Sequence, residues 1–306
     1  MGETVSADEA MGQLRAAFPE LRVKRYAFAG EGYDSVALLV NGEDIFRFAK
    51  RPDVAVRQAR EATLLPLLVD RLPLAVPRYT HVWADPAWPG ARIVGYRLIP
   101  GEQLFPDRAR PEHRETQAAQ LGAFLSALHG IPTDEARRAG ALGGDAESWR
   151  TEYRDFFEVA REHMLPLFDI HERAAIEAFW RGFLEDDGHF AFAPALVHRD
   201  LNTEHILFDP ATSRLTGVID WGDASIGDPA IDFTAIRREL DEDFCRQTLA
   251  AYCLPRDASF VSRMDFYNRM IPFHELRFGQ VDGSPEHVEQ GLAMARHQLR
   301  EAGHAW

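Results

Sequence analysis

The pattern of apolar residues in this chain changes at Pro100-Gly101. Before that point, short apolar runs separated by turn residues are typical of strands, whereas after it apolar residues recur at the spacing of helices. No flexible linker or internal repeat separates the two parts. We therefore expect an α+β fold with two lobes, a small strand-rich lobe over residues 1–99 and a larger helical lobe over residues 100–306, joined by a hinge at about 96–101. Ligands favour the cleft between two such lobes.

Local signals predict the individual elements. Asn41-Gly42 lies between two apolar runs and is a strong hairpin signal. The stretch from Met1 to Ser6 matches a myristoylation pattern, but Ser6 with Glu9 is better explained as a capping box that begins a helix. We predict strands at 35–40, 45–48, 79–83 and 92–99, helices at 52–69, 112–129, 147–165 and 172–184, and a short strand-rich interlude at 196–221.

The composition excludes several kinds of partner. Of the 306 residues, 34 are Lys or Arg and 48 are Asp or Glu, so the formal net charge is −14. An acidic surface of this kind repels nucleic acid and anionic membranes, and it attracts polycations. Cys245 and Cys253 are too few for a disulfide framework and lack metal-ligand spacing. No apolar run is long enough to span a membrane, and the few cysteines fit a reducing compartment, so we expect a cytoplasmic protein. We also expect a monomer whose partner is a small molecule.

A segment of short strands separated by polar residues carries the chemistry. It contains His198-Arg199-Asp200 and, further on, Asp220-Trp221-Gly222. Both patterns are typical of phosphoryl-transfer enzymes, in which one carboxylate receives the proton of the acceptor hydroxyl and another holds Mg²⁺ on the nucleotide phosphates. We assign the first role to Asp200 and the second to Asp220. The third metal position, five residues after Asp200, is usually Asn and is His205 here.

Two other interpretations of these residues are open at this point. His198, Asp200 and His205 could form the transition-metal site of a hydrolase, since imidazole is a softer ligand than an amide oxygen. We favour a different role for His198, in which it braces the loop by hydrogen bonds to the backbone. Asp200 and Asp220 could also be turn-forming aspartates, but their spacing and flanking strands match a phosphoryl-transfer site better.

These motifs resemble those of the aminoglycoside phosphotransferases, most closely the 2''-phosphotransferase branch, and of the related macrolide phosphotransferases. The resemblance runs through nearly the whole chain and includes Gly30 to Asp34, Gly95 to Gly101, the H-x-D-x₄-H pattern that ends at His205, and Ile219 to Phe233. It implies a bilobal protein-kinase-like fold and an antibiotic-resistance enzyme that transfers the γ-phosphoryl group of GTP or ATP to an aminoglycoside hydroxyl, with Mg²⁺ as cofactor. The alternatives are a macrolide 2'-phosphotransferase, a kinase of another small alcohol, and a catalytically inactive nucleotide-binding regulator.

The resemblance also implies a nucleotide site in the first lobe. Arg47 stands where the family has a lysine, and its guanidinium could hold both a phosphate and the carboxylate of Glu61. An ordinary surface ion pair is the alternative for these two residues. Tyr96 falls at the gatekeeper position, so we expect GTP to serve at least as well as ATP. The implied nucleotide-binding residues are Gly30, Gly32, Ser35, Arg47, Lys50, Glu61, Tyr96, Arg97 and Ile99.

We predict that Asp228 braces the catalytic loop through backbone hydrogen bonds, as an Asp after the metal loop does in kinase-like folds. Asp232 is the alternative, and His198 and Arg199 also support the site.

A polycationic acceptor requires a pocket of carboxylates and aromatic rings. A macrolide would instead need a wide apolar cleft. Phe266, Phe273 and Phe278 could supply such a cleft, although their helical spacing favours a place in the core. The predicted acceptor-binding residues are Asp223, Glu239, Asp241, Glu242, Tyr267 and Glu275.

Overall fold

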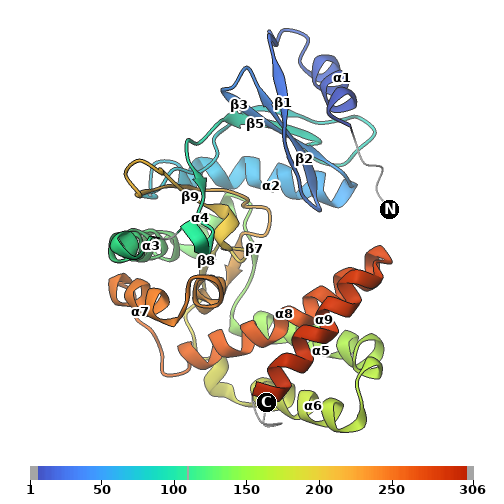
Figure 1. Cartoon of the computed structure of the whole chain (residues 1–306), viewed down its shortest axis with the longest axis vertical. Helices are drawn as coiled ribbons and strands as arrows, with labels where there is room; N and C mark the ends of the chain where they lie inside the picture. The colour runs from blue at the N-terminus through green and yellow to red at the C-terminus, as the bar shows by residue number, and fades with distance from the viewer. Residues whose placement is uncertain (1–5, 109, 302–306) are drawn as a thin grey trace.

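A computed structural model describes residues 6–108 and 110–301 (Figure 1). The N-terminal lobe contains an antiparallel sheet of five strands in the order β1-β2-β3-β5-β4. Its strands are β1 (Tyr26–Glu31), β2 (Ser35–Val40), β3 (Asp44–Ala49), β4 (Tyr79–Trp83) and β5 (Ile93–Arg97). Helix α1 (Ala7–Ala17) packs on this sheet, and α2 (Pro52–Leu68) lies between the sheet and the C-terminal lobe.

Two local predictions in this lobe are confirmed. Asn41 and Gly42 adopt φ angles of 57° and 76° in the turn that joins β2 to β3. This is the left-handed region that Asn and Gly tolerate best. Ser6 and Glu9 form the capping box of α1, because each side chain accepts a hydrogen bond from the backbone N–H of the other.

The C-terminal lobe is mostly helical, as predicted, and holds two small sheets of three strands each. The sheets have the orders β10-β9-β6 and β7-β11-β8, and they position the segment between β8 and β11 that carries the chemistry. The strands are β6 (Glu102–Gln103), β7 (Leu142–Gly143), β8 (Ala195–Val197), β9 (Ile206–Phe208), β10 (Leu215–Val218) and β11 (Ser225–Gly227). The main helices are α3 (Arg114–His129), α4 (Thr133–Arg138), α5 (Ala146–His163), α6 (Ile170–Glu185), α7 (Glu242–Ala251), α8 (Phe260–Asp282) and α9 (Pro285–Glu301).

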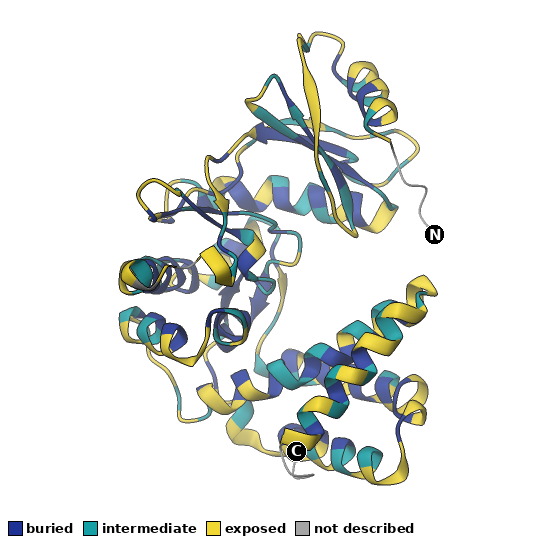
Figure 2. Cartoon of the chain, in the orientation of Figure 1, coloured by how far each residue is buried: buried dark blue, intermediate teal, exposed yellow. Residues whose placement is uncertain are grey.

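The hydrophobic interior is divided between the lobes. One cluster lies between α1 and the N-terminal sheet, and a much larger one fills the C-terminal lobe. Leu64, Leu65 and Leu68 of α2 belong to the larger cluster, so this helix is anchored to the second lobe although it precedes β4 and β5. Figure 2 shows buried residues where the helices and strands of each lobe pack together, and exposed residues along the outer sides of the helices.

Within the described part of the chain, no helix is both long and apolar enough to cross a bilayer. Cys245 is buried and Cys253 is exposed, and both are free thiols. Phe266 and Phe273 lie in the core, as their helical spacing predicted, whereas Phe278 is only partly buried and faces a cavity.

Candidate active site

The loop that follows β8 is held in place by Asp232. The carboxylate of Asp232 accepts hydrogen bonds from the backbone N–H groups of His198 and Arg199, at 2.8 and 2.7 Å. The ring Nε2 of His129 lies 3.1 Å from the same carboxylate. Arg199 has a φ of 69°, a conformation that costs free energy in a residue other than glycine. The two hydrogen bonds that Asp232 accepts stabilise this conformation, which turns the next residue, Asp200, toward the cleft.

The predicted brace, Asp228, has another role, and this prediction was wrong. Its carboxylate accepts hydrogen bonds from Arg263 and, at 2.6 Å, from the hydroxyl of Tyr267. Both partners are on α8, so Asp228 fastens this helix to the segment after β11. The alternative residue, Asp232, is the one that contacts the catalytic loop. Two aspartates four residues apart in one short segment have similar sequence surroundings, and only the tertiary contacts distinguish them.

His198 is a bracing residue, as we favoured, and is fully buried. Its Nε2 atom donates to the carbonyl of Ile219 at 3.0 Å, and its Nδ1 accepts from the N–H of Asp200 at 3.3 Å. Burial lowers the pKa of His198, so the ring is neutral. Because both ring nitrogens are used inside the loop, His198 has no lone pair to offer a metal, and the hydrolase interpretation loses one of its three ligands.

Asp200 reaches the cleft with its carboxylate partly exposed. The side-chain amide of Asn202 donates to its Oδ1 at 2.6 Å. Partial burial raises the pKa of Asp200 to about 6, helped by the negative charges of Asp223 and Asp220 and opposed by His205. A carboxylate with such a pKa is ionised at neutral pH yet more basic than an ordinary aspartate, which suits a group that receives a proton.

His205 and Asp220 face each other as a pair of possible metal ligands. The Nδ1–H of His205 donates to the carbonyl of Asp200 at 2.7 Å, which leaves Nε2 free to point at Asp220, 3.8 Å from its Oδ2. Among the described residues, no group of three or more His, Cys, Asp or Glu could hold a metal ion. Mg²⁺ in phosphoryl-transfer sites takes one or two protein ligands and completes its shell with phosphate oxygens and water, so this pair fits it.

Arg47 connects the metal-ligand pair to the N-terminal lobe. From β3, its guanidinium reaches Glu61 on α2 at 3.2 Å and Asp220 at 3.0 Å. Arg47 and Glu61 are only 8% and 2% exposed, so the surface-pair alternative is wrong. The hydroxyl of Tyr79 donates to Glu61 as well. Burial alone would raise the pKa of Asp220, but the charges of Arg47 and His205 outweigh it and lower that pKa.

Lys50 lies apart from this group and points to the glycine loop between β1 and β2. Its Nζ atom donates to the carbonyl of Gly32 at 2.7 Å and pairs with Glu31 at 2.5 Å. The N–H of Gly32 donates to the carbonyl of Ser35, at 3.0 Å. Open space surrounds the Cα atoms of Gly30 and Gly32, so packing within the chain does not require glycine there. A ligand that needs close approach to the backbone would require it.

The predicted hinge residues follow the central strands of the first sheet. Tyr96 is buried in β5 beside Tyr79 of β4, with ring centroids 5.7 Å apart, and burial raises its pKa to about 12. Arg97 turns outward and pairs with Glu43 at 2.7 Å, and Ile99 is buried in the hinge between the lobes. The role of Tyr96 beside the base stays a prediction.

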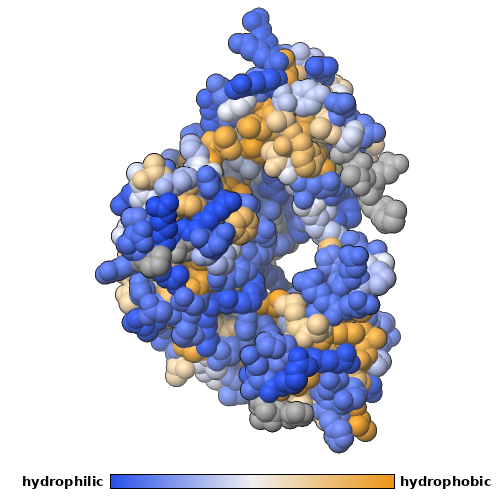
Figure 3. Space-filling model, in the orientation of Figure 1, coloured by the Kyte–Doolittle hydropathy of each residue, from blue (hydrophilic) through white to orange (hydrophobic). Residues whose placement is uncertain are grey.

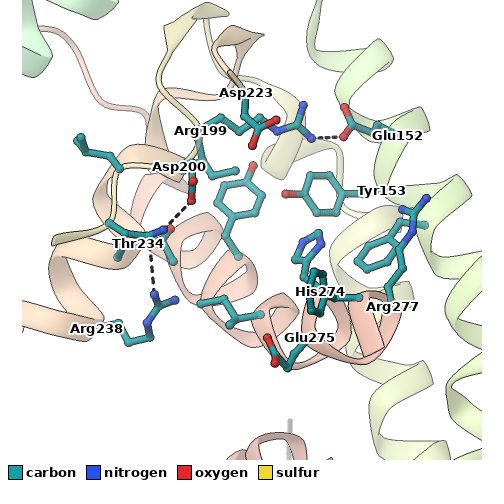
Figure 4. Close-up of a pocket in the computed structure, with 18 of the residues that line it drawn as sticks. Glu152, Tyr153, Arg199, Asp200, Asp223, Thr234, Arg238, His274, Glu275 and Arg277 are labelled. Atoms are coloured by element: carbon teal, nitrogen blue, oxygen red, sulfur yellow. Dashed lines mark hydrogen bonds and ion pairs between the residues drawn. The ribbon is translucent and has the colours of Figure 1, made fainter. Parts of the chain in front are cut away.

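A cavity of about 880 Å³ opens beside Asp200 in the C-terminal lobe. Figure 4 shows Asp200 and Asp223 on one side of it, and Tyr153, His274 and Arg277 on the other. Of the predicted acceptor-binding residues, the structure brings Asp223, Tyr267 and Glu275 into its wall. A cavity of this volume is large enough for a drug-sized ligand.

The structure places the other three predicted acceptor residues outside the lining of this cavity, in contacts with other side chains. Glu239 accepts hydrogen bonds from the N–H and hydroxyl of Thr203, at 2.9 and 2.7 Å. Asp241 caps the N-terminus of α7 and pairs with Arg114 at 2.7 Å. Glu242 pairs with Arg237. Asp241 and Glu242 lie at the N-terminus of α7, where acidic side chains commonly stabilise a helix.

Several cavity residues were not predicted. Glu152 and Asp155 project from α5, and His274 and Arg277 project from α8. Arg199, predicted only as support, extends over the cavity to Glu152, with its guanidinium 4.9 Å from the centre of the Trp149 ring. Residues three apart on a helix share a face, so the spacing of Glu152 and Asp155 was a weak sequence signal of a shared acidic surface. Which face meets the cavity is decided by packing.

Comparisons with known proteins agree with this geometry. A family model described as the phosphotransferase enzyme family matches residues 25–261. Viomycin phosphotransferase from Streptomyces vinaceus is 29% identical over 198 residues, which are 64% of this chain and 66% of that protein. An aminoglycoside 2''-phosphotransferase solved with GDP and kanamycin superposes with a TM-score of 0.88 at 25% identity, covering 95% of this chain and 98% of that one. Macrolide 2'-phosphotransferase type I shares the fold, with a TM-score of 0.78 at 23% identity over 95% and 98% of the two chains.

Proposed function

The chain belongs to the phosphotransferase enzyme family, and we propose that it transfers the γ-phosphoryl group of GTP or ATP to a hydroxyl of an aminoglycoside. One observation carries the proposal. Asp200 lies in the wall of the large cavity and, through its backbone carbonyl, also holds His205, which faces Asp220. The proton acceptor for the substrate and one ligand of the phosphate-bound metal are therefore parts of one loop, and the second ligand, Asp220 in the segment after β10, faces that loop.

In the proposed reaction, the acceptor hydroxyl oxygen bonds to the γ-phosphorus as the bond to the β–γ bridging oxygen breaks. GDP or ADP leaves, and the hydroxyl proton passes to the carboxylate of Asp200. Asn202 holds that carboxylate by its hydrogen bond to Oδ1, so one oxygen is oriented and the other remains available. The phosphorylated acceptor then carries the transferred group, and Asp200 loses its proton to solvent.

Mg²⁺ would be held by the Nε2 of His205 and the carboxylate of Asp220, and it supplies charge neutralisation across the phosphates. The cation of Arg47 is already aimed at this position through its ion pair with Asp220. Glu61 fixes the other half of the Arg47 guanidinium, so the buried charge stays compensated when phosphate oxygens approach. We expect the base to lie near Tyr96, where the buried ring favours GTP at least as much as ATP.

The charge of the cavity supports a polycationic acceptor. Five carboxylates line it, from Glu152, Asp155, Asp200, Asp223 and Glu275, and the whole chain carries a formal charge of −14. Ammonium groups are attracted to such a wall and to aromatic faces. The relatives are consistent with this chemistry, since one is a viomycin phosphotransferase and another was solved with kanamycin bound.

A macrolide is the second candidate, and the composition of the cavity wall favours it. Phe156, Val159, Ile231, Ile271 and Phe278 line the cavity, which gives it a substantial apolar surface. Three arginines in the same wall, Arg199, Arg238 and Arg277, reduce its negative charge. A large, mostly apolar acceptor with a single amine would fit such a surface.

A panel of aminoglycosides and macrolides, each assayed with GTP and with ATP, tests the proposal. We expect nucleotide-dependent phosphorylation of at least one aminoglycoside, with loss of turnover in Asp200→Ala. Turnover of macrolides alone would establish the second candidate. Nucleotide binding without turnover of any acceptor would instead support the inactive regulator, for which the replacement of the strand lysine by Arg47 is the supporting feature.

A further inference from the structure

Tyr33 joins the glycine loop of the N-terminal lobe to the far end of α8. Its ring meets Phe278 edge to face, with ring centroids 4.3 Å apart, and its hydroxyl donates to Asp282 Oδ1 at 3.1 Å. The two partners lie about 250 positions further along the chain. This contact, which we call the Tyr33 bridge, connects the two lobes on the side of the cleft away from the hinge.

The N-terminal side of the Tyr33 bridge is firmly held. The guanidinium of Arg51 lies over the Tyr33 ring, 4.1 Å from its centre, and donates to the carbonyl of Tyr33 at 3.2 Å. Arg51 also pairs with Asp34 at 2.7 Å, and Lys50 binds the carbonyl of Gly32. The loop therefore cannot move far without either carrying Tyr33 with it or breaking these contacts.

The C-terminal side of the Tyr33 bridge belongs to the cavity. Phe278 lines the cavity next to Arg277, one helical turn before Asp282. Figure 3 shows a hollow between the lobes, and beyond it the N-terminal lobe meets the ends of α8 and α9 again. Through Phe278, the Tyr33 bridge thus contacts the wall of the cavity that Asp200 also lines.

We propose that Tyr33 is a specificity-determining residue of the acceptor site, and that it couples acceptor binding to nucleotide binding. The inference rests on the proposed function, in which the glycine loop covers the donor phosphates. An acceptor that contacts Phe278 changes the position of Tyr33, and a nucleotide that orders the loop changes the position of Phe278. Tyr33 is 40% exposed, so the bridge can open for an acceptor to enter.

Substitutions at Tyr33 test this coupling. In the wild-type enzyme, we expect a saturating acceptor to tighten binding of a non-hydrolysable GTP analogue by about fivefold or more. In Tyr33→Ala this factor falls to about 1, and the KM for the acceptor rises several-fold while kcat changes less. Tyr26→Phe is the matched control, since Tyr26 binds Asp8 on the outer side of the same sheet. A wild-type coupling factor that persists in Tyr33→Ala would overturn the proposal.

The hydrogen bond is tested by a double-mutant cycle. Tyr33→Phe and Asp282→Ala each remove the bond from Tyr33 to Asp282, so the double variant should show the same acceptor KM as either single variant. Additive effects of the two substitutions would show that Asp282 does not act through Tyr33. Both positions are exposed, so we expect these two variants to fold even if Tyr33→Ala is unstable.

Amide exchange gives a measurement that needs no acceptor. With a GTP analogue alone, we expect slower hydrogen exchange at residues 276–282 of wild type, weaker protection in Tyr33→Phe, which keeps the ring contact, and none in Tyr33→Ala. If no antibiotic is phosphorylated but this protection is seen, the proposed acceptor is wrong and the coupling stands. Protection that is equal in all three proteins would refute the coupling whatever the acceptor.

Discussion

The guanidinium of Arg47 lies 3.0 Å from the carboxylate of Asp220, across the boundary between the lobes. Arg47 comes from the central β3 of the first sheet, and Asp220 from the segment after β10 in the second lobe. Phosphate oxygens can replace the carboxylate as partners of the same guanidinium, because both groups present two neighbouring oxygens that accept its N–H bonds. We propose that the donor nucleotide binds at this ion pair and joins the two lobes there.

Arg47→Met should weaken nucleotide binding. Methionine has no charge with which to hold a phosphate beside Glu61, so we expect the KM for GTP to rise by about tenfold, which corresponds to about 1.4 kcal/mol. Steady-state kinetics with varied GTP measure this effect. Arg97→Met is the control, because Arg97 is exposed and pairs only with surface carboxylates. An unchanged KM would show that Arg47 does not contact the nucleotide.

Asp200→Asn should abolish most turnover without loss of the fold. The amide can still accept the hydrogen bond from Asn202 but cannot receive a proton, and we expect kcat to fall by about 10²- to 10⁴-fold. The melting temperature should remain close to that of wild type. Asp134→Asn, an exposed change on α4, is the control and should keep full activity. A folded Asp200→Asn protein with near-normal kcat would refute the role assigned to Asp200.

Asp232→Asn and Asp228→Asn should affect different properties. The first weakens the two hydrogen bonds to the catalytic loop, so we expect kcat to fall and the free energy of unfolding to drop by about 1–3 kcal/mol. Asp228→Asn weakens the contact with Arg263 and Tyr267, so it should lower the free energy of unfolding. For the same loss of stability, we expect kcat to fall less in Asp228→Asn than in Asp232→Asn. Kinetics and urea unfolding of both variants measure the difference. Equal losses of kcat at equal stability would contradict the bracing role of Asp232.

His198 should make the stability of the fold depend on pH. Its pKa is lowered by burial, so below its ordinary value of about 6.5 the unfolded chain binds a proton that the folded chain does not. Stability is therefore lost as the pH falls below about 6.5, by about 1.4 kcal/mol for each unit by which the folded pKa is lowered. Urea unfolding of wild type and His198→Gln between pH 5 and pH 8 tests this. The difference between the two proteins should shrink toward low pH, and a constant difference would exclude the effect.

Tyr96→Met should shift nucleotide choice toward ATP. If the base binds beside Tyr96, as we propose, the flexible and unbranched side chain of methionine leaves more room for it than the buried ring does. We expect the ratio of kcat/KM for ATP to that for GTP to rise by about fivefold, which corresponds to about 1 kcal/mol. Tyr26→Met changes an exposed tyrosine of the same sheet and should leave the ratio unaltered. Use of ATP alone by the wild-type enzyme would contradict the premise of this experiment.

The sequence by itself determined the features that depend on near neighbours. The Asn41-Gly42 hairpin and the Ser6–Glu9 cap follow from backbone conformations and hydrogen bonds within a few residues. Asp200 and His205 lie five residues apart in one braced loop, so a short motif was enough to predict that they lie together. The two-lobed fold followed in the same way, from the change of apolar spacing at Pro100-Gly101.

Only the tertiary structure decided which side chains surround the acceptor cavity. Asp155 and Arg277 lie on helices with several polar faces, and packing selects the face that meets the cavity. Glu239 and Asp241 instead accept hydrogen bonds from other parts of the chain, outside the lining of the cavity. The contact of Tyr33 with Phe278 joins residues from opposite ends of the chain. Such a contact forms through the docking of whole lobes, whose energy is spread over many residues, and no short segment of sequence encodes it.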